Sequence, residues 1–159
     1  MDAGFDVVSL ANNHIWDWGT DALSDTLSHL DGARIRHVGA GMSEAAANAP
    51  VVVELDGNRI VFVSWTDLYP EGLEAKGDTP GISRFREDEA AARVRELSFG
   101  HDVVVVLVHW GDEYRTSANE TQRRIAQSLV DAGADLVIGH HPHVVQEVER
   151  YKEGWVAYS

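Results

Sequence analysis

The sequence predicts an α/β protein in which helices cover a β-sheet. Short apolar segments of strand type alternate with segments whose apolar residues recur at helical spacing, and this alternation is typical of the fold class. Hydrophobic residues make up 44% of the chain and charged residues 25%, which is the balance of a folded globular protein. The 159 residues suffice for one domain with a sizeable core, and no linker or repeat divides them. We therefore expect a single domain over residues 1–159.

The first part of the chain is expected to form strands, short helices and a hairpin. In order, these are a strand over 6–10, a helix over 20–30, a weak strand over 35–38, one or two helical turns over 43–48, and a hairpin of strands 51–55 and 60–65. The helix over 20–30 carries Leu23, Leu27 and Leu30 at helical spacing. Thr20 is its candidate N-cap and Gly32 its candidate stop.

The second part of the chain is expected to hold the most deeply buried strand. In order, the predicted elements are a helix over 87–97, a strand over 102–108, a helix over 120–132, a strand over 135–138, and a hairpin of strands 144–151 and 155–158. The run of valines in the strand over 102–108 indicates burial on both faces. A long loop over 67–85 is rich in Gly and Pro, and we expect it to be either a substrate lid or a mobile surface segment.

Charge and composition exclude several classes of function. The formal net charge is −13 and the pI is about 4.8, so the chain should repel nucleic-acid phosphates and bind no nucleic acid. An anionic substrate would need cations in its site to offset this charge. The lack of cysteine excludes disulfides and thiolate metal sites. No apolar run reaches the ~20 residues of a membrane helix, so no membrane segment is expected in this chain.

Nitrogen-bearing side chains follow three of the predicted strands. They are Asn12, Asn13 and His14 after the first strand, His109 after the valine strand, and His140, His141 and His143 after the strand over 135–138. Ligands gather at the carboxyl ends of strands in open α/β sheets, and neutral imidazole is a common ligand of zinc, iron or manganese. The sequence therefore predicts a metal site at one edge of the sheet.

Each junction also has a structural interpretation. His109 taken alone is typical of a hydrogen-bonded core residue, and Asn13-His14 taken alone is typical of a turn that bonds its own backbone. The three imidazoles of the segment 140–143 are harder to bury without a metal. An α/β domain with purely structural histidines is the alternative to a metal site.

Longer motifs around these residues resemble a known family. The segment Asn13–Gly19 (NHIWDWG) resembles the Asn-His-x-x-Asp-x-Gly block of calcineurin-like metallophosphoesterases. The segments Ser9–His14 (SLANNH), His109–Tyr114 (HWGDEY) and Ala132–Gln146 (AGADLVIGHHPHVVQ), in this order, resemble the CapA family of capsule (poly-γ-glutamate) synthesis proteins, a branch of that superfamily. The resemblance runs the full length of the chain and implies a metallophosphoesterase-like arrangement of sheet layers flanked by helices.

The resemblance also implies a site with two divalent metal ions, for which Mn, Fe, Zn and Mg are all candidates. Asn13 and His109 correspond to ligands of the same ion. His141 and His143 correspond to the His-x-His pair that closes the site, one for each ion. His140 is the alternative to His141, because two adjacent histidines leave the register of the motif open.

The same resemblance assigns two catalytic roles. His14 corresponds to the general acid that protonates the leaving oxygen, and Asp17 to the carboxylate that orients this histidine. Glu113 and Gln146 match family positions near the site, but no role follows for either of them from the sequence.

The ends of the sequence depart from the family pattern. The superfamily begins with an Asp-bearing strand and a Gly-Asp segment, which resembles Asn-Leu-Glu in CapA proteins, whereas residues 1–5 lie just before the strand that carries Asn13. The family continues with Leu-Gly-Asn-Phe where this sequence ends at Ser159. We therefore expect 1–159 to be one partial domain that lacks the first metal-ligand strands and the C-terminal end. A natural short variant with a single metal is the alternative.

The resemblance implies a metal-dependent phosphoesterase-type hydrolase domain associated with capsule or poly-γ-glutamate biosynthesis. The alternative is a non-catalytic protein that binds capsule polymer or assists its export with the same fold. The expected partners are an anionic small molecule or polymer as substrate, and the capsule-synthesis machinery. The family also implies an extracytoplasmic or membrane-associated location.

Overall fold

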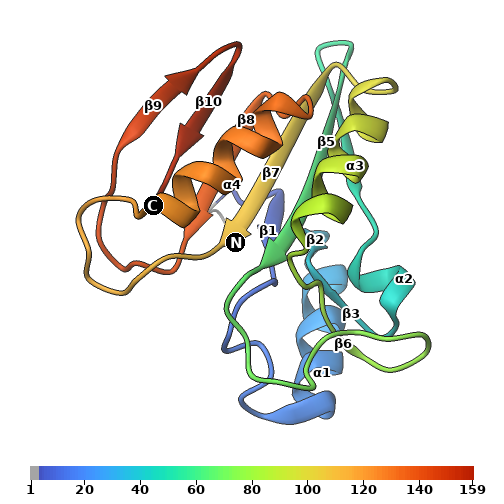
Figure 1. The fold of residues 1–159 in the computed structure, drawn as a ribbon. Coiled ribbons are helices and arrows are strands. Elements are labelled where there is room, and N and C mark those ends of the chain that lie inside the picture. The colour runs from blue at the N-terminus through green and yellow to red at the C-terminus, as the bar shows by residue number, and fades with distance from the viewer. Residues whose placement is uncertain (1–3) are drawn as a thin grey trace. The chain divides into compact units, whose positions relative to one another are not determined.

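The computed structural model describes residues 4–159 and shows the predicted alternation of strands and helices (Figure 1). In chain order the elements are β1 (Val7–Ser9), α1 (Gly19–Gly32), β2 (Arg36–Val38), β3 (Ala40–Gly41), α2 (Glu44–Ala47), β4 (Val51–Leu55), β5 (Asn58–Thr66), β6 (Gly81–Ile82), α3 (Glu87–Ser98), β7 (Val103–His109), α4 (Glu120–Asp131), β8 (Leu136–His140), β9 (Val148–Tyr151) and β10 (Gly154–Ala157). The α/β fold class is thereby confirmed. None of the helices in the described part of the chain is long and apolar enough to cross a membrane.

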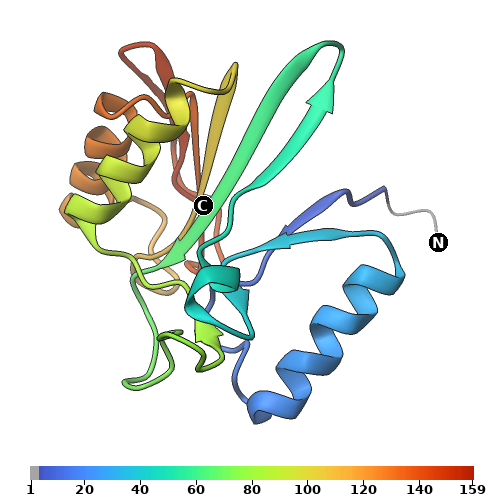
Figure 2. The same ribbon diagram turned by 90° about the vertical axis from the view of Figure 1, so that its right-hand side faces the viewer.

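Most strands belong to one six-stranded sheet with the order β4-β5-β7-β8-β10-β9. Strand β8 pairs in parallel with β7 on one side and with β10 on the other, and β9 adds an antiparallel edge. Helices α3 and α4 lie side by side on one face of this sheet, where α3 packs on β7 and α4 on β8 (Figure 2). Two further pairs, β1 with β2 and β3 with β6, form separate two-stranded sheets.

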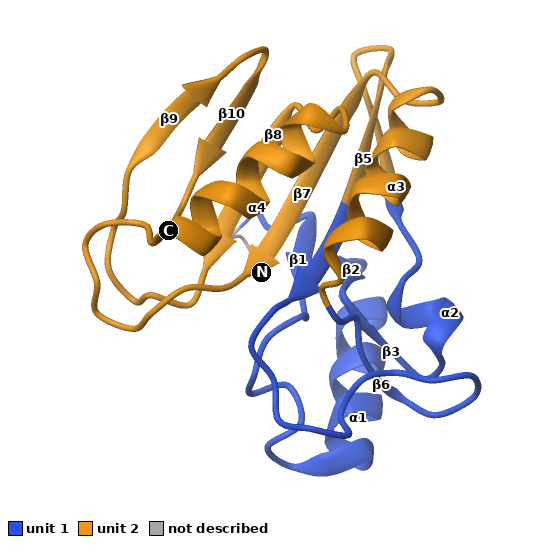
Figure 3. Ribbon diagram, viewed as in Figure 1, with its two compact units in different colours: residues 1–51, 63–84 blue, residues 52–62, 85–159 orange. Residues whose placement is uncertain are grey.

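The chain divides into two compact units, each made of two sequence segments (Figure 3). Unit 1 comprises residues 1–51 and 63–84, and unit 2 comprises residues 52–62 and 85–159. Strand β5 begins in unit 2 and ends in unit 1. The expectation of a single domain over 1–159 stays a prediction.

The core of unit 1 forms around the predicted face of α1. Leu23 and Leu27 are buried there together with Leu10, Ala40 and Ile82. The bounds of the helix differ slightly from the prediction. It begins at Gly19, one residue early, so the cap position falls on Trp18 and the prediction of Thr20 as N-cap is wrong.

The long loop of unit 1 has more structure than its sequence suggests. Strand β6 pairs with β3, and the Ala75 amide donates to the Ile82 carbonyl at 3.0 Å. Tyr69 and Leu73 pack on the unit 1 core, on which Ile15 and Trp16 also pack. The prediction of one long loop over 67–85 is therefore wrong in part, because it missed the short strand β6 at Gly81–Ile82. The role of this segment as a substrate lid stays a prediction.

The core of unit 2 lies between the sheet and its two helices. The valine strand is buried as predicted, from Val104 to His109. Helix α4 presents Ile125, Ala126 and Leu129 to this core. A capping box begins α4: the Asn119 side chain accepts from the Gln122 amide at 2.9 Å, and the Gln122 side chain accepts from the Asn119 amide at 3.0 Å. The Asn-x-x-Gln spacing could have revealed this box.

Gly139 in β8 sits where three chain segments meet tightly. A Cβ at this position would lie 2.0 Å from the Tyr158 carbonyl oxygen and 2.2 Å from Trp110 Nε1. These two atoms form a buried hydrogen bond of 2.9 Å. The strand next to the candidate metal ligands therefore has no room for a side chain at this point.

The substitution Gly139→Ala is expected to destabilise the protein, because the new methyl group must displace the Trp110 indole or the backbone at Tyr158. Overpacking of this kind costs about 1–3 kcal/mol, and the free energy of unfolding in urea should fall accordingly. Gly100→Ala is the control, since a Cβ there meets no atom within 4 Å. Equal unfolding midpoints for the two variants would contradict the prediction.

Candidate metal centre

The carboxyl ends of β7 and β8 lie next to each other at one edge of the large sheet. The two strands pair in parallel, and their register places His109 opposite His140. The Trp110 amide then donates to the His140 carbonyl at 3.1 Å, which extends the pairing by one residue. The structure thus brings two of the three predicted junctions to the same place.

Three imidazoles gather beyond these strand ends. The ring centroids of His109 and His141 are 4.6 Å apart, and those of His141 and His143 are 5.7 Å apart. His109 is 8% exposed, whereas His143 is exposed to solvent. The group therefore has a buried inner member and an open outer side through which an ion or substrate could approach.

Glu113 completes this group. One ligand atom each from Glu113, His141 and His143 can be chosen so that all three atoms lie within 4.8 Å of one another. The loop that carries Glu113 is tied to the histidine loop, because the Tyr114 amide donates to the Pro142 carbonyl at 2.8 Å. Two imidazole nitrogens and one carboxylate oxygen form a donor set that suits zinc, manganese or iron. The residues present therefore fit a divalent ion.

The backbone of both loops adopts unusual conformations at this point. His141, His143 and Tyr114 have φ angles of 105°, 59° and 60°. Residues other than glycine rarely adopt positive φ angles. Such conformations cost on the order of 1–3 kcal/mol each and persist where surrounding contacts fix them, often at functional sites. The ring centroids of Tyr114 and His143 are 5.9 Å apart, so these two rings are neighbours that can help to fix both loops.

His140 lies outside the group formed by Glu113, His141 and His143. Burial lowers the pKa of its imidazole, and a hydrogen bond with the Val108 backbone partly opposes this effect. His140 is nevertheless exposed to solvent as a residue. Of the two adjacent histidines that the sequence left open, His141 is the one that the structure groups with Glu113 and His143, and its role as a ligand stays a prediction.

Unit 1 carries the remaining predicted site residues in a tight turn after β1. His14 Nδ1 lies 2.9 Å from Asp17 Oδ2, and both side chains are more than half exposed, at 68% and 52%. The His14 amide donates to Asn12 Oδ1 at 2.9 Å, and the Asp17 amide donates to the His14 carbonyl at 3.1 Å. Asn12 thus shapes the turn, while the Asn13 amide group makes no hydrogen bond with the described residues.

One part of the predicted arrangement is wrong. Strand β1 pairs with β2 in a separate sheet, so Asn13 and His14 do not follow a strand of the sheet that carries His109. The approach of Asn13 and His14 to the histidines of unit 2 stays a prediction. Glu113 was given no role from the sequence, and the signal available was an acid four residues after His109, in a loop that follows a buried strand.

Comparisons with known proteins agree with the motifs. The family model described as "Bacterial capsule synthesis protein PGA_cap" matches residues 1–159. The capsule biosynthesis protein CapA of Bacillus anthracis is 36% identical over 99% of this chain, and the PGA biosynthesis protein CapA of Bacillus subtilis is also 36% identical over 99%. The chain spans 39% and 42% of the lengths of these two relatives.

Solved structures support the fold. A hypothetical protein from Thermus thermophilus matches with a TM-score of 0.60 at 22% identity, over 97% of this chain and 52% of its own. The NAD nucleotidase NadN of Haemophilus influenzae matches with a TM-score of 0.60 at 18% identity, over 98% of this chain and 31% of its own. At these identities the likeness extends to the fold alone.

The adjacent histidines provide a direct test of the metal group. His141→Ala should weaken the binding of Mn²⁺ or Zn²⁺ by about tenfold or more. Loss of a residue that only orients a metal ligand already lowers metal affinity by about this factor, and loss of a ligand should cost at least as much. His140→Ala is the matched control and should change the affinity less than about twofold, since its ring lies outside the group. Titration calorimetry measures both variants, and the reverse order of effects would contradict the assignment.

Proposed function

Because the chain belongs to the PGA_cap family of bacterial capsule synthesis proteins, we propose that it is a metal-dependent, phosphoesterase-type hydrolase domain that acts in capsule or poly-γ-glutamate biosynthesis. The observation that carries this proposal is the group of Glu113, His141 and His143, whose ligand atoms approach within 4.8 Å of one another. Histidines with a purely structural role would not need a carboxylate beside them. A divalent ion, in contrast, is bound well by two imidazoles together with a carboxylate.

The proposed metal ligands combine this group with residues that the family resemblance implies. Glu113, His141 and His143 form the group that would bind metal, with His109 beside them. The family pattern adds Asn13 as a further ligand and assigns His141 and His143 to different ions. Divalent ions in such a site would offset the charge of an anionic substrate and lower the pKa of a bound water. The family pattern for two ions includes further carboxylates, and the chain spans about two fifths of its relatives' length, so the two-ion site is a proposal for the whole protein.

The proposed acid is His14. Its Nδ1 faces the Asp17 carboxylate at 2.9 Å, which fixes the ring orientation and leaves Nε2 for the substrate. A carboxylate in this position orients the imidazole, as the aspartate does in hydrolase triads. When protonated, His14 can donate the Nε2 proton to the leaving oxygen of a phosphoester. Its high exposure leaves this nitrogen accessible to a substrate.

The proposed setting is the synthesis of capsule polymer at or outside the cell membrane. The relatives are named for capsule and PGA biosynthesis, and a capsule lies outside the cell, which supports an extracytoplasmic or membrane-associated location. An anionic small molecule or polymer fits the proposed chemistry, because bound divalent ions would offset the repulsion from the protein's own charge of −13.

His14→Ala in the full-length protein is expected to slow hydrolysis of a phosphoester whose leaving group is an alkyl alcohol by ~100-fold, because proton donation to such a leaving group contributes about 10²–10⁴-fold. Asp17→Asn should lower the rate less, since the ring stays in place with a weaker partner. His29→Ala is the control, because His29 is an exposed histidine on α1 that bonds the Asp25 carbonyl within its own helix. Metal content, measured by mass spectrometry, should be equal in all of these variants.

Two results would replace this proposal with the non-catalytic one. The first is a full-length protein that takes up metal but hydrolyses no phosphoester tested. The second is His14→Ala leaving capsule production in cells unchanged. Together they would assign the same fold and metal group to binding or export of the polymer.

A further inference from the structure

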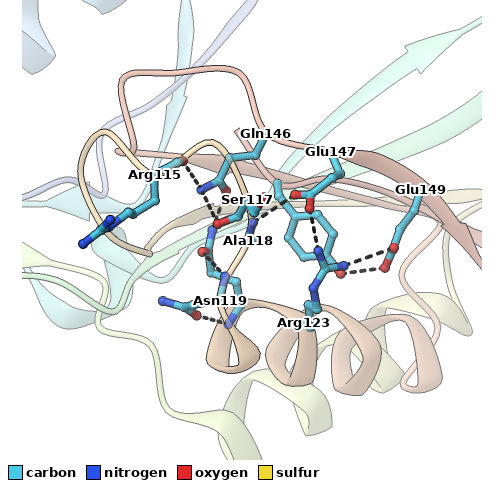
Figure 4. A network of polar contacts seen from close by, with 10 residues as sticks. Arg115, Ser117, Ala118, Asn119, Arg123, Gln146, Glu147 and Glu149 are labelled. Atoms are coloured by element: carbon cyan, nitrogen blue, oxygen red, sulfur yellow. Dashed lines mark hydrogen bonds and ion pairs between the residues drawn. The ribbon is translucent and has the colours of Figure 1, made fainter.

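Gln146 is a buried polar side chain close in sequence to the metal group. It lies three residues after His143 and is 4% exposed. Figure 4 shows it pointing from the segment before β9 toward the loop that follows β7. A buried amide needs partners for its oxygen and for both of its hydrogens, so the identity of those partners indicates what it holds in place.

Its partners form a directed chain of hydrogen bonds. Gln146 Nε2 donates to the carbonyl oxygens of Arg115 at 2.8 Å and Ser117 at 3.4 Å. Gln146 Oε1 accepts from Gln122 Nε2 at 2.9 Å. Gln122, which is 1% exposed, accepts in turn from the Asn119 amide at the start of α4. Each amide is thereby fixed in one orientation, because turning either of them would set two donors or two acceptors against each other.

The loop held in this way is the one that carries Glu113. Residues 111–118 lie within the connection between β7 and α4, and the bonds from Gln146 fix the second half of this loop. The Ala118 amide donates to Glu147 Oε2 at 2.9 Å, which adds a third bond between the loop and the same segment. At the other end, Gly111 lies so close to Gln122 that a Cβ there would be 2.7 Å from the Gln122 amide. Gln146 therefore holds one end of the loop by hydrogen bonds, and Gln122 packs closely against the other end.

We propose that Gln146 is a positioning residue, which sets Glu113 against His141 and His143 through the loop 111–118. The inference rests on the proposed metal site. It goes beyond that site because the side-chain hydrogen bonds of Gln146 lead to the loop and to α4, and not to a candidate ligand. Gln146 and His143 lie on one continuous segment, so the segment that supplies the imidazoles also holds the loop that supplies the carboxylate. This arrangement couples the two halves of the ligand set.

The chemistry of the amide defines the variant that tests this role. Gln146→Glu keeps the shape of the side chain but replaces both donors by an oxygen, which would face the carbonyls of Arg115 and Ser117. Buried carbonyls that lose their donors favour a loop conformation that reaches water. The loop should then move, and Glu113 with it, while His141 and His143 keep their place at the end of β8.

The experiment is a double-mutant cycle read by Mn²⁺ titration. Gln146→Glu should weaken Mn²⁺ binding by about tenfold, the range expected for a residue that orients a metal ligand. In a Glu113→Gln background the same change should weaken binding less than about twofold, because the ligand that Gln146 positions is already gone. Gln127→Glu is the matched control, since it adds the same charge on α4 at a half-buried position.

The cycle separates positioning from mere stability. Unchanged Mn²⁺ affinity in Gln146→Glu, or an equal loss in both backgrounds, would overturn the role of Gln146 while leaving the metal site intact. No Mn²⁺ binding by the unsubstituted protein would overturn the metal site and this inference together. If circular dichroism shows that Gln146→Glu does not fold, Gln146→Asn replaces it under the same criteria, since it keeps the amide but shortens its reach.

Discussion

The parallel pairing of β7 with β8 is the constraint on which the candidate site depends. Its register sets His109 opposite His140, so the residues that follow both strands leave the sheet side by side. Gly139 makes this close approach possible, because the Trp110 indole and the Tyr158 carbonyl occupy the space of its missing side chain. The paired strands therefore fix where both loops begin. Only the conformations of the two loops beyond the sheet remain to determine how the candidate ligands meet.

The backbones of both loops are strained at residues with positive φ angles. The sheet and several hydrogen bonds hold the loops in these conformations. His141 and His143 hold left-handed backbone conformations on either side of Pro142, whose carbonyl accepts from the Tyr114 amide. A loop with free ends would relax into a conformation of lower energy. Here one end continues from β8 and the other is fixed by Gln146, so the unfavourable conformation is sustained by bonds on both sides.

The periodicity of the sequence was enough to predict most of the fold, and the exceptions have physical causes. Leu23 and Leu27 repeat at helical spacing and are buried as expected, since burial of an amphipathic face is a local property. Strands β3 and β6 were missed because they pair Gly41 with Gly81, and glycine usually argues against a strand. Both glycines are needed there, since a Cβ at Gly41 would lie 2.6 Å from the Ala47 amide and one at Gly81 2.4 Å from the Ala75 amide.

The site was predictable only where a strand end determines the position of a side chain. His109 and the 140–143 segment could be placed together because parallel strands end at one edge. The choice between His140 and His141 could not be made, because it depends on where the ladder stops. His140 is the last residue in register with β7. His141, the first residue beyond the register and with a φ of 105°, is the one grouped with Glu113. Glu113 enters the group through a loop conformation held by the amides of Gln146 and Gln122, so its spacing from His109 could mark it only as an acid near the site.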